Sequence, residues 1–138
     1  MQKRKRIITF GTFDLFHLGH VRLLVRAAQL GDHLTVGVSS DAFSQRKKGR
    51  RPIYNERERM EIVASCKPVD ECFFEESMEK KRDYIVNYGA DILVMGDDWV
   101  GKFDNFSDIC QVVYLPRTTG VSTTELLDGI AHARQASA

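Results

Sequence analysis

The sequence predicts an α/β domain with a five-stranded parallel sheet and helices on both of its faces. Five short segments rich in Val, Ile and Leu alternate with longer segments in which apolar residues recur at helical spacing. This alternation is typical of parallel strands joined by helical crossovers. At 138 residues, the chain is long enough for one domain with its own core and too short for two ordinary domains. We therefore expect a single domain over residues 1–138, with a frayed tail at 135–138.

A strand–helix–strand unit opens the predicted fold. The apolar run at residues 7–10 indicates the first strand, and apolar residues at helical spacing over 21–28 indicate the helix that follows it. Gly31 and Asp32 form a typical helix stop, and residues 33–39 then alternate and branch like a second strand.

The middle of the chain is expected to begin with a short helix over 41–45. A basic stretch over 46–52 comes next, and its Gly and Pro predict a mobile loop. The remaining elements keep the alternation of helix and strand, and Ser122 and Glu125 have the spacing of a capping box at the start of the last helix. Helices are expected at residues 55–66, 77–88 and 122–130. Strands are expected at residues 69–74, 91–95 and 110–115.

The ten residues after the first strand carry the strongest functional signal. Residues 11–20 read GTFDLFHLGH and lead into the first helix. Gly11 allows the backbone to turn tightly or to approach a ligand, and the free amide groups at a helix N-terminus attract an anion. If the helix begins near Gly19, His17 and His20 face the same phosphate from its first turn.

Two other interpretations of these histidines have to be weighed. His-x-x-His spacing alone is weak evidence, because two surface histidines can flank a helix start that Asp14 caps. A metal pair would need a third ligand, and no nearby Cys or His supplies one. The preceding strand, the glycines and the following helix together favour an anion site.

A second candidate anion site lies near the end of the chain, where residues 117–124 read RTTGVSTT. Arg117 supplies a planar guanidinium, its neighbours supply hydroxyl groups and a flexible glycine, and a helix begins here. The alternative is that Ser122 only caps the helix while Arg117 is a solvated surface residue. Like residues 11–20 and 96–99, this segment follows the carboxyl end of a strand, which is where parallel sheets bind ligands.

Residues 96–99 read GDDW and follow the fourth predicted strand. Either Asp97 or Asp98 is able to bind a ribose, a base or a metal ion, or to cap the local turn, and we favour Asp98 as the binding residue. Trp99 is expected to pack under this loop rather than to stack on a base.

The motifs at residues 11–20 and 117–124 resemble known signatures. GTFDxxHxGH is similar to the nucleotide-binding signature of the nucleotidyltransferase superfamily, which includes cytidylyltransferases and several adenylyltransferases. RTxG(V/I)STT resembles the second signature of the cytidylyltransferase family. Residues 94–104 and 113–117 are similar to the glycerol-3-phosphate cytidylyltransferases within that family, and the resemblance extends from Ile7 to about Ile130.

The resemblance implies a Rossmann-like enzyme that transfers CMP from CTP to sn-glycerol 3-phosphate, giving CDP-glycerol and pyrophosphate. CTP and a small phosphorylated alcohol are the implied partners, Mg²⁺ is expected to arrive bound to CTP rather than in a protein metal site, and a homodimer is expected. The product would serve as a precursor of teichoic acid or another surface glycan.

The resemblance also implies roles for individual residues. The implied catalytic residues are His17, His20, Lys47 and Arg117. The implied nucleotide-binding residues are Thr12, Phe13, His17, Leu18, Gly19, His20, Arg50, Asp98, Arg117, Thr118, Thr119, Gly120, Val121, Ser122, Thr123 and Thr124. The implied acceptor-binding residues are Lys47, Arg59 and Lys81. From their helical positions alone, Arg59 and Lys81 would be solvated basic side chains.

The chain departs from the family pattern in its basic stretch. One extra residue between Lys47 and Arg59 places Gly49 where a nucleotide-contacting Lys is expected, which leaves Lys48 or Arg50 to supply that contact. Lys67 also stands where an Arg often occurs, which keeps the charge and loses the bidentate geometry.

Rival functions keep the fold and change the ligands. They are a cytidylyltransferase for phosphoethanolamine, phosphocholine or another sugar-alcohol phosphate, an enzyme that uses ATP, and a catalytically silent nucleotide-binding module.

The formal net charge of +1 and the lack of aromatic residues within the basic stretch argue against a nucleic-acid partner. No apolar run is long enough for a membrane span. Three scattered cysteines indicate the reducing cytoplasm and no zinc site.

Overall fold

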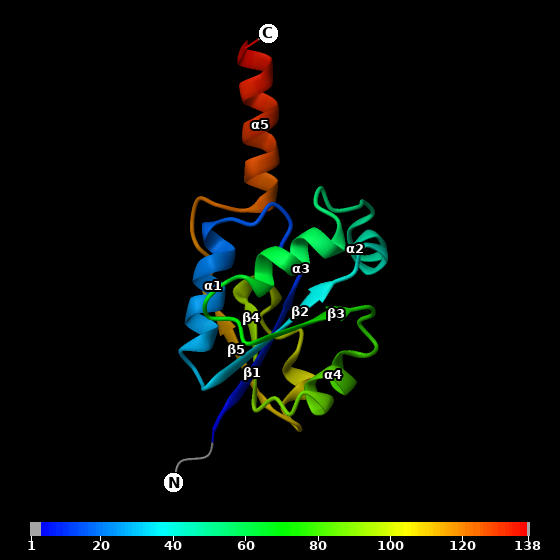
Figure 1. The fold of residues 1–138 in the computed structure, drawn as a ribbon, viewed down its shortest axis with the longest axis vertical. Helices are drawn as coiled ribbons and strands as arrows, with labels where there is room; N and C mark the ends of the chain where they lie inside the picture. The colour runs from blue at the N-terminus through cyan, green and yellow to red at the C-terminus, as the bar shows by residue number, and fades with distance from the viewer. Residues whose placement is uncertain (1–3, 138) are drawn as a thin grey trace.

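Five parallel strands form one sheet in the order β3-β2-β1-β4-β5 in the computed structural model, which describes residues 4–137 (Figure 1). The strands are β1 (Arg6–Gly11), β2 (His33–Ser39), β3 (Glu71–Glu75), β4 (Ile92–Gly96) and β5 (Gln111–Leu115). β1 is the central strand and pairs through Ile8 with Thr35 on one side and with Leu93 on the other. The predicted parallel sheet is confirmed. The chain crosses over in opposite directions on either side of β1, so the carboxyl ends of β1 and β4 border the crevice where such sheets bind ligands.

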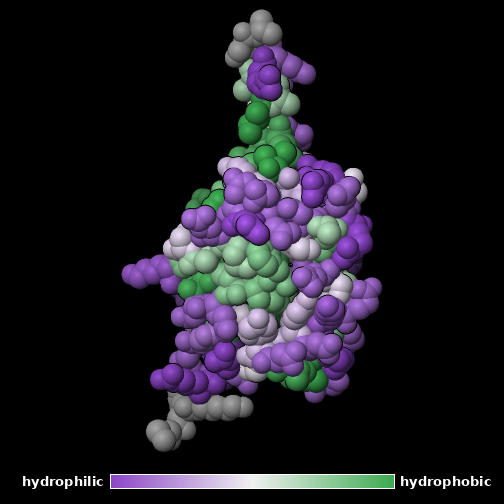
Figure 2. All heavy atoms as spheres, turned by 45° about the vertical axis from the view of Figure 1, so that its right-hand side comes forward, coloured by the Kyte–Doolittle hydropathy of each residue, from purple (hydrophilic) through white to green (hydrophobic). Residues whose placement is uncertain are grey.

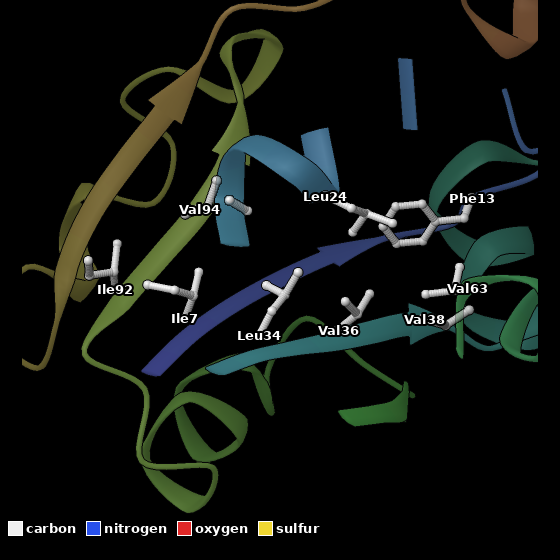
Figure 3. Packing of buried hydrophobic residues seen from close by; sticks show 10 residues of the cluster. Ile7, Phe13, Leu24, Leu34, Val36, Val38, Val63, Ile92 and Val94 are labelled. Atoms are coloured by element: carbon white, nitrogen blue, oxygen red, sulfur yellow. The ribbon is translucent and has the colours of Figure 1, made fainter. Parts of the chain in front are cut away.

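Helices cover both faces of the sheet, as expected. One face packs against α1 (Leu18–Ala28) and α3 (Glu56–Ala64), and the other packs against α4 (Lys81–Asn87) and two short 3-10 turns, η1 (Asp97–Trp99) and η2 (Asp104–Phe106). Figure 3 shows the first of these cores, in which Ile7, Leu34 and Ile92 lie side by side on neighbouring strands. Ile8 and Phe10 belong to the opposite core, because alternate residues of a strand point to opposite faces.

The basic stretch is helical over its first part rather than a loop. α2 (Asp41–Lys48) continues through the segment that we expected to leave the helix after residue 45. The Ser40 hydroxyl accepts the N–H of Phe43 at the start, and Gly49, with φ of 74°, ends the helix in the left-handed conformation. The predicted mobile loop over 46–52 is therefore wrong for residues 46–48, and Lys47 and Lys48 stand on a rigid element.

Other boundaries also differ from the prediction, among them the starts of β3 and α4. β3 begins at Glu71 rather than at 69, because the N–H of Val69 closes a turn onto Cys66. α4 begins at Lys81 rather than at 77, since residues before it form a turn in which Ser77 accepts the N–H of Lys80.

The last helix, α5 (Thr123–Ser137), stands away from the body of the domain (Figure 1). The Ser122 hydroxyl accepts the N–H of Glu125, as the capping pattern predicts. The helix extends to Ser137, beyond the expected end at residue 130. The frayed tail over 135–138 stays a prediction, and residue 138 lies outside the described chain. None of the helices within residues 4–137 combines the length and the apolar character that crossing a bilayer requires.

Candidate active site

Two histidines cap the helix that follows the central strand. His17 is the N-cap of α1, and its Nδ1 accepts the N–H of Gly19 at 3.0 Å. In return, the Nδ1 of His20 accepts the N–H of His17 at 3.1 Å, and the two rings stack with their centroids 3.7 Å apart. A histidine is unusual at the N-cap position, which Ser, Thr, Asp or Asn usually fill. The imidazoles are thus held by the start of the helix and lie together, as the sequence predicts.

The hydrogen bonds of the two rings determine their tautomers. Because each Nδ1 accepts a backbone N–H, the proton of each neutral ring lies on Nε2. Burial lowers the pKa of His17, and it lowers the pKa of His20 to about 3, with further contributions from the charges of His17 and Lys48. Near neutral pH both rings are uncharged and each offers an Nε2–H donor.

The backbone of this loop is strained. Phe13 and Leu15 have φ of 57° and 48°, in the left-handed region that non-glycine residues rarely adopt. Phe13 is buried beneath the histidines, and its ring centroid lies 5.3 Å from that of His20. A Cβ on Gly19 would lie 2.8 Å from Cε1 of His17, so a larger residue there would displace the imidazole.

Contacts from distant parts of the chain hold the strained loop in place. The Asp14 carboxylate accepts the N–H groups of Ile53 and Tyr54 at 2.8 and 2.9 Å. It therefore ties the loop to the segment before α3, and the alternative that Asp14 caps α1 is wrong. The Thr123 hydroxyl donates to the Asp14 carbonyl at 2.9 Å, which joins the start of α5 to the same loop.

A cleft of about 230 Å³, which we call the histidine cleft, opens beside these rings. The sequence-predicted nucleotide-binding residues that line it are His17, Gly19, His20, Asp98, Arg117, Thr118, Val121, Ser122 and Thr123. Leu23, Gly96, Leu115 and Pro116 also line the cleft. The sequence placed Gly96, Leu115 and Pro116 in segments of interest but assigned none of the four to the site. Arg117 Nη1 lies 3.6 Å from Asp98 Oδ1 across it. The cleft therefore combines helix N-termini, N–H donors and one guanidinium, a set suited to an anion.

The other predicted nucleotide-binding residues lie around the cleft rather than among its lining residues. Thr12 faces a second pocket, and Phe13 supports the loop from below. Thr119 lines an open hollow with Arg22 and Arg26. The residues Leu18, Arg50, Gly120 and Thr124 are exposed.

The second pocket, which we call the lysine pocket, has a volume of about 120 Å³. Its ionisable lining residues are Lys47, Lys48, Glu75 and Lys81. Lys81 is only 2% exposed and donates to Glu75 Oε2 at 2.6 Å, so the expectation that it is solvated is wrong. Burial lowers the pKa of all three lysines, that of Lys47 to about 8. The sequence offered Lys48 only as an alternative to Arg50 for a nucleotide contact and gave no role to Glu75, because nothing in a single sequence places them at one pocket.

Lys48 connects the two depressions. It lines the lysine pocket, and its charge contributes to the lowered pKa of His20 in the histidine cleft. Of the two candidates for the displaced basic contact, Lys48 is the one near the histidines, because it lines the lysine pocket and its charge acts on His20, whereas Arg50 lies beyond the end of α2.

Arg59 is fully buried rather than solvated. Its Nη1 donates to the carbonyls of Thr12 and Ser39 at 2.8 and 2.7 Å. Its Nη2 pairs with Asp41 at 2.8 Å, and its Nε donates to the Tyr54 carbonyl. These bonds tie together the ends of β1 and β2 and the start of α2. Arg59 is absent from the lining of the lysine pocket and acts on it through these positions.

The chain is similar to known proteins in both sequence and structure. A family model described as cytidylyltransferase-like matches residues 8–128. The chain is 47% identical to a glycerol-3-phosphate cytidylyltransferase of Bacillus subtilis (strain 168), over 92% of this chain and 98% of the relative. It is 43% identical to a glycerol-3-phosphate cytidylyltransferase of Staphylococcus aureus, over 88% and 92% of the two chains. A lipopolysaccharide core biosynthesis protein from Thermoplasma volcanium has a similar structure, with a TM-score of 0.74 and 26% identity over 84% of this chain and 99% of that one.

The central position of Arg59 predicts a large effect on stability. Replacing Arg59 by Met leaves the Asp41 carboxylate and several buried carbonyls without their donor, and we expect a loss of about 3–5 kcal/mol in the free energy of unfolding. Urea unfolding followed by circular dichroism measures this loss. Arg57 is exposed on the same helix and provides the matched control, Arg57→Met, for which we expect a change within about 0.5 kcal/mol. Equal stability of the two variants would contradict the role of Arg59.

Proposed function

The chain belongs to the cytidylyltransferase-like family, and we propose that it transfers CMP from CTP to sn-glycerol 3-phosphate, giving CDP-glycerol and pyrophosphate. The observation that carries the choice of acceptor is the match over nearly the full length of relatives that bear this name. The structure supports a two-substrate reaction, because two depressions suited to anions lie on either side of one loop.

In this proposal the histidine cleft binds CTP. The triphosphate lies at the N-terminus of α1, where the Nε2–H groups of His17 and His20 donate to phosphate oxygens. Arg117 and the hydroxyls at the start of α5 bind the nucleotide from the other side, and Asp98 lines the same cleft. Uncharged imidazoles are able to fill this role, because N–H donors held in fixed positions stabilise the charge that grows in the transition state.

The lysine pocket binds the acceptor phosphate through Lys47 and Lys81, and Lys48 lies between this pocket and the nucleotide in the histidine cleft. A phosphate monoester has a second pKa of about 6 and is a dianion near neutral pH, so no general base is needed to make it a nucleophile. One of its oxygens forms a bond to the α-phosphorus of CTP, the bond from that phosphorus to the β-phosphate oxygen breaks, and pyrophosphate leaves with the electron pair. The enzyme's task is to hold two anions in line, which positive groups in a dry site do well.

We propose that Mg²⁺ enters with CTP. Such an ion binds phosphate oxygens and needs only one or two protein carboxylates, a requirement that Asp98 fits because it lines the histidine cleft. When bound, the ion would offset negative charge on the triphosphate. The proposal also includes a cytoplasmic location and a product that donates glycerol phosphate to a surface polymer such as teichoic acid.

The most direct test of the function is a product assay. With CTP and glycerol 3-phosphate we expect CDP-glycerol and pyrophosphate, and slower turnover with ATP, phosphocholine or phosphoethanolamine. We expect His20→Asn to lower kcat by about 100-fold, because the amide oxygen still accepts the N–H of His17 while the Nε2–H donor is lost. Circular dichroism checks that the variant is folded. A preference for ATP, or unchanged pyrophosphate release by His20→Asn, would contradict the proposal.

The pKa of Lys47 predicts the alkaline limit of the reaction. Because burial lowers this pKa to about 8, the Lys47 ammonium is present below that pH and is lost above it. We therefore expect kcat/KM for the acceptor to fall above about pH 8, whereas KM for CTP changes little. Lys47→Arg keeps its charge to a much higher pH and should move this fall to higher pH. An identical pH profile in the two enzymes would show that Lys47 does not set the limit.

We propose a homodimer in which a second copy covers the apolar side of α5. Ile130 is 55% exposed on this projecting helix, next to the half-buried Leu126 and Leu127. Figure 2 shows strongly hydrophobic residues at the surface where the helix leaves the body. A projecting helix with an apolar stripe is typical of an interface between chains.

Light scattering coupled to size-exclusion chromatography tests this interface. We expect the unmodified protein to be a dimer and Ile130→Asp to shift it toward a monomer, because a carboxylate would be buried without a partner. His132→Asp introduces the same charge on the opposite side of the helix and should leave the dimer intact. A dimer that survives Ile130→Asp, or a monomer in every case, would rule out this surface.

A further inference from the structure

The lysine pocket contains a carboxylate, Glu75, to which neither the sequence nor the proposed function gives a role. Glu75 is the last residue of β3 and is 1% exposed. Its Oε2 accepts from Lys81 Nζ at 2.6 Å, and its carbonyl accepts the N–H of Ser40 at 2.9 Å, next to the start of α2. Both ends of this residue are therefore fixed by the framework of the pocket.

Lys81 depends on this carboxylate for its charge. Its Nζ lies 3.7 Å from the centroid of the Phe10 ring and 5.2 Å from that of Phe103, so aromatic faces replace most of its water. The ammonium is almost completely withdrawn from solvent, and the hydrogen bond to Glu75 opposes the effect of burial on its pKa. Without the carboxylate, an ammonium in these surroundings would lose its proton readily.

The charge of the pocket matches the proposed acceptor. Three lysines and one glutamate line it, which leaves a formal excess of two positive charges. A phosphate monoester above its second pKa of about 6 carries nearly two negative charges. An acceptor with an ammonium group would instead bring a further cation into a pocket whose carboxylate already pairs with Lys81.

We infer that Glu75 is the positioning residue of the acceptor pocket: it holds Lys81 as a fixed, protonated donor and so adapts the pocket to phosphate monoesters of uncharged alcohols. This inference rests on the proposed function. Glu75 acts through Lys81 and need not touch either substrate.

The groups around Lys81 define how it responds to pH. Glu75 faces it from β3, Lys47 and Lys48 approach from α2, and Arg59 of α3 contributes to the field at Lys47. Phe10 of β1 and Phe103, which follows η1, are uncharged. Glu75 also raises the pKa of Lys47 against the effect of burial. Removing its charge should therefore make both lysines lose their protons at a lower pH.

The test compares Glu75→Gln, Lys81→Met and the double variant with the unmodified enzyme. For Glu75→Gln we expect KM for glycerol 3-phosphate to rise about tenfold, KM for CTP to stay within about twofold, and the fall in kcat/KM at alkaline pH to begin at a lower pH. If Glu75 acts through Lys81, the double variant should be no worse than Lys81→Met alone. Glu75→Asp keeps the carboxylate and should recover the pH profile in part.

Three results would overturn the inference: an equal rise in both KM values, an unchanged pH profile in Glu75→Gln, or losses that multiply in the double variant.

A second measurement does not depend on turnover or on the acceptor. Nitrogen-detected NMR of the lysine side chains should show that Lys81 stays protonated to a higher pH in the unmodified protein than in the Glu75→Asp and Glu75→Gln variants. If this difference is found but no CDP-glycerol is formed, the proposed function fails and the role of Glu75 in holding Lys81 stands. If CDP-glycerol is formed and Lys81 titrates identically, the inference about Glu75 fails alone.

Discussion

The reciprocal cap of His17 and His20 is the interaction on which the rest of the site depends. Each imidazole satisfies a backbone N–H at the start of α1, so the same bonds that begin the helix also select the tautomer of each ring. The strained conformation of Phe13 and Leu15 is kept because the buried Phe13 ring and the bonds of Asp14 leave the loop no other arrangement. The histidines are consequently fixed before any ligand arrives.

The site gathers positive groups while limiting their mutual repulsion. Arg59 is surrounded by carbonyls and one carboxylate, and Lys81 by aromatic faces and one carboxylate, so each buried cation has a specific partner. Lys47 has a hydroxyl partner in Ser39 and a pKa that burial lowers to about 8. The two imidazoles remain uncharged near neutral pH, because burial lowers both of their pKa values. An empty site with two fully charged histidines beside three lysines would be much less stable.

Local patterns predict most of the fold, and contacts between distant segments explain what they miss. Patterns among neighbouring residues predict the alternating strands and helices, the loop at residues 11–20 and the Ser122 cap. The structure contains all of them. Residue spacing cannot reveal that Arg59 and Lys81 turn inward, because the partners that hold them, such as Thr12 and Glu75, lie on other elements. Nothing in the sequence indicated a role for Glu75, since its place at the end of an edge strand matters only because Lys81 of α4 lies next to it. The length of α2 was predicted wrongly because a glycine such as Gly49 is equally typical of a loop and of the position that ends a helix.

The central claim is that both histidines are neutral donors held by their own helix. Long-range ¹H–¹⁵N NMR of the histidine side chains during a pH titration of the free protein tests it directly, because the two ring nitrogens report proton position and charge separately. The account predicts that both rings are neutral and protonated on Nε2 at pH 7, and that His20 stays neutral until the pH approaches about 3. An imidazolium at pH 7, or a proton on Nδ1 of either ring, would contradict it.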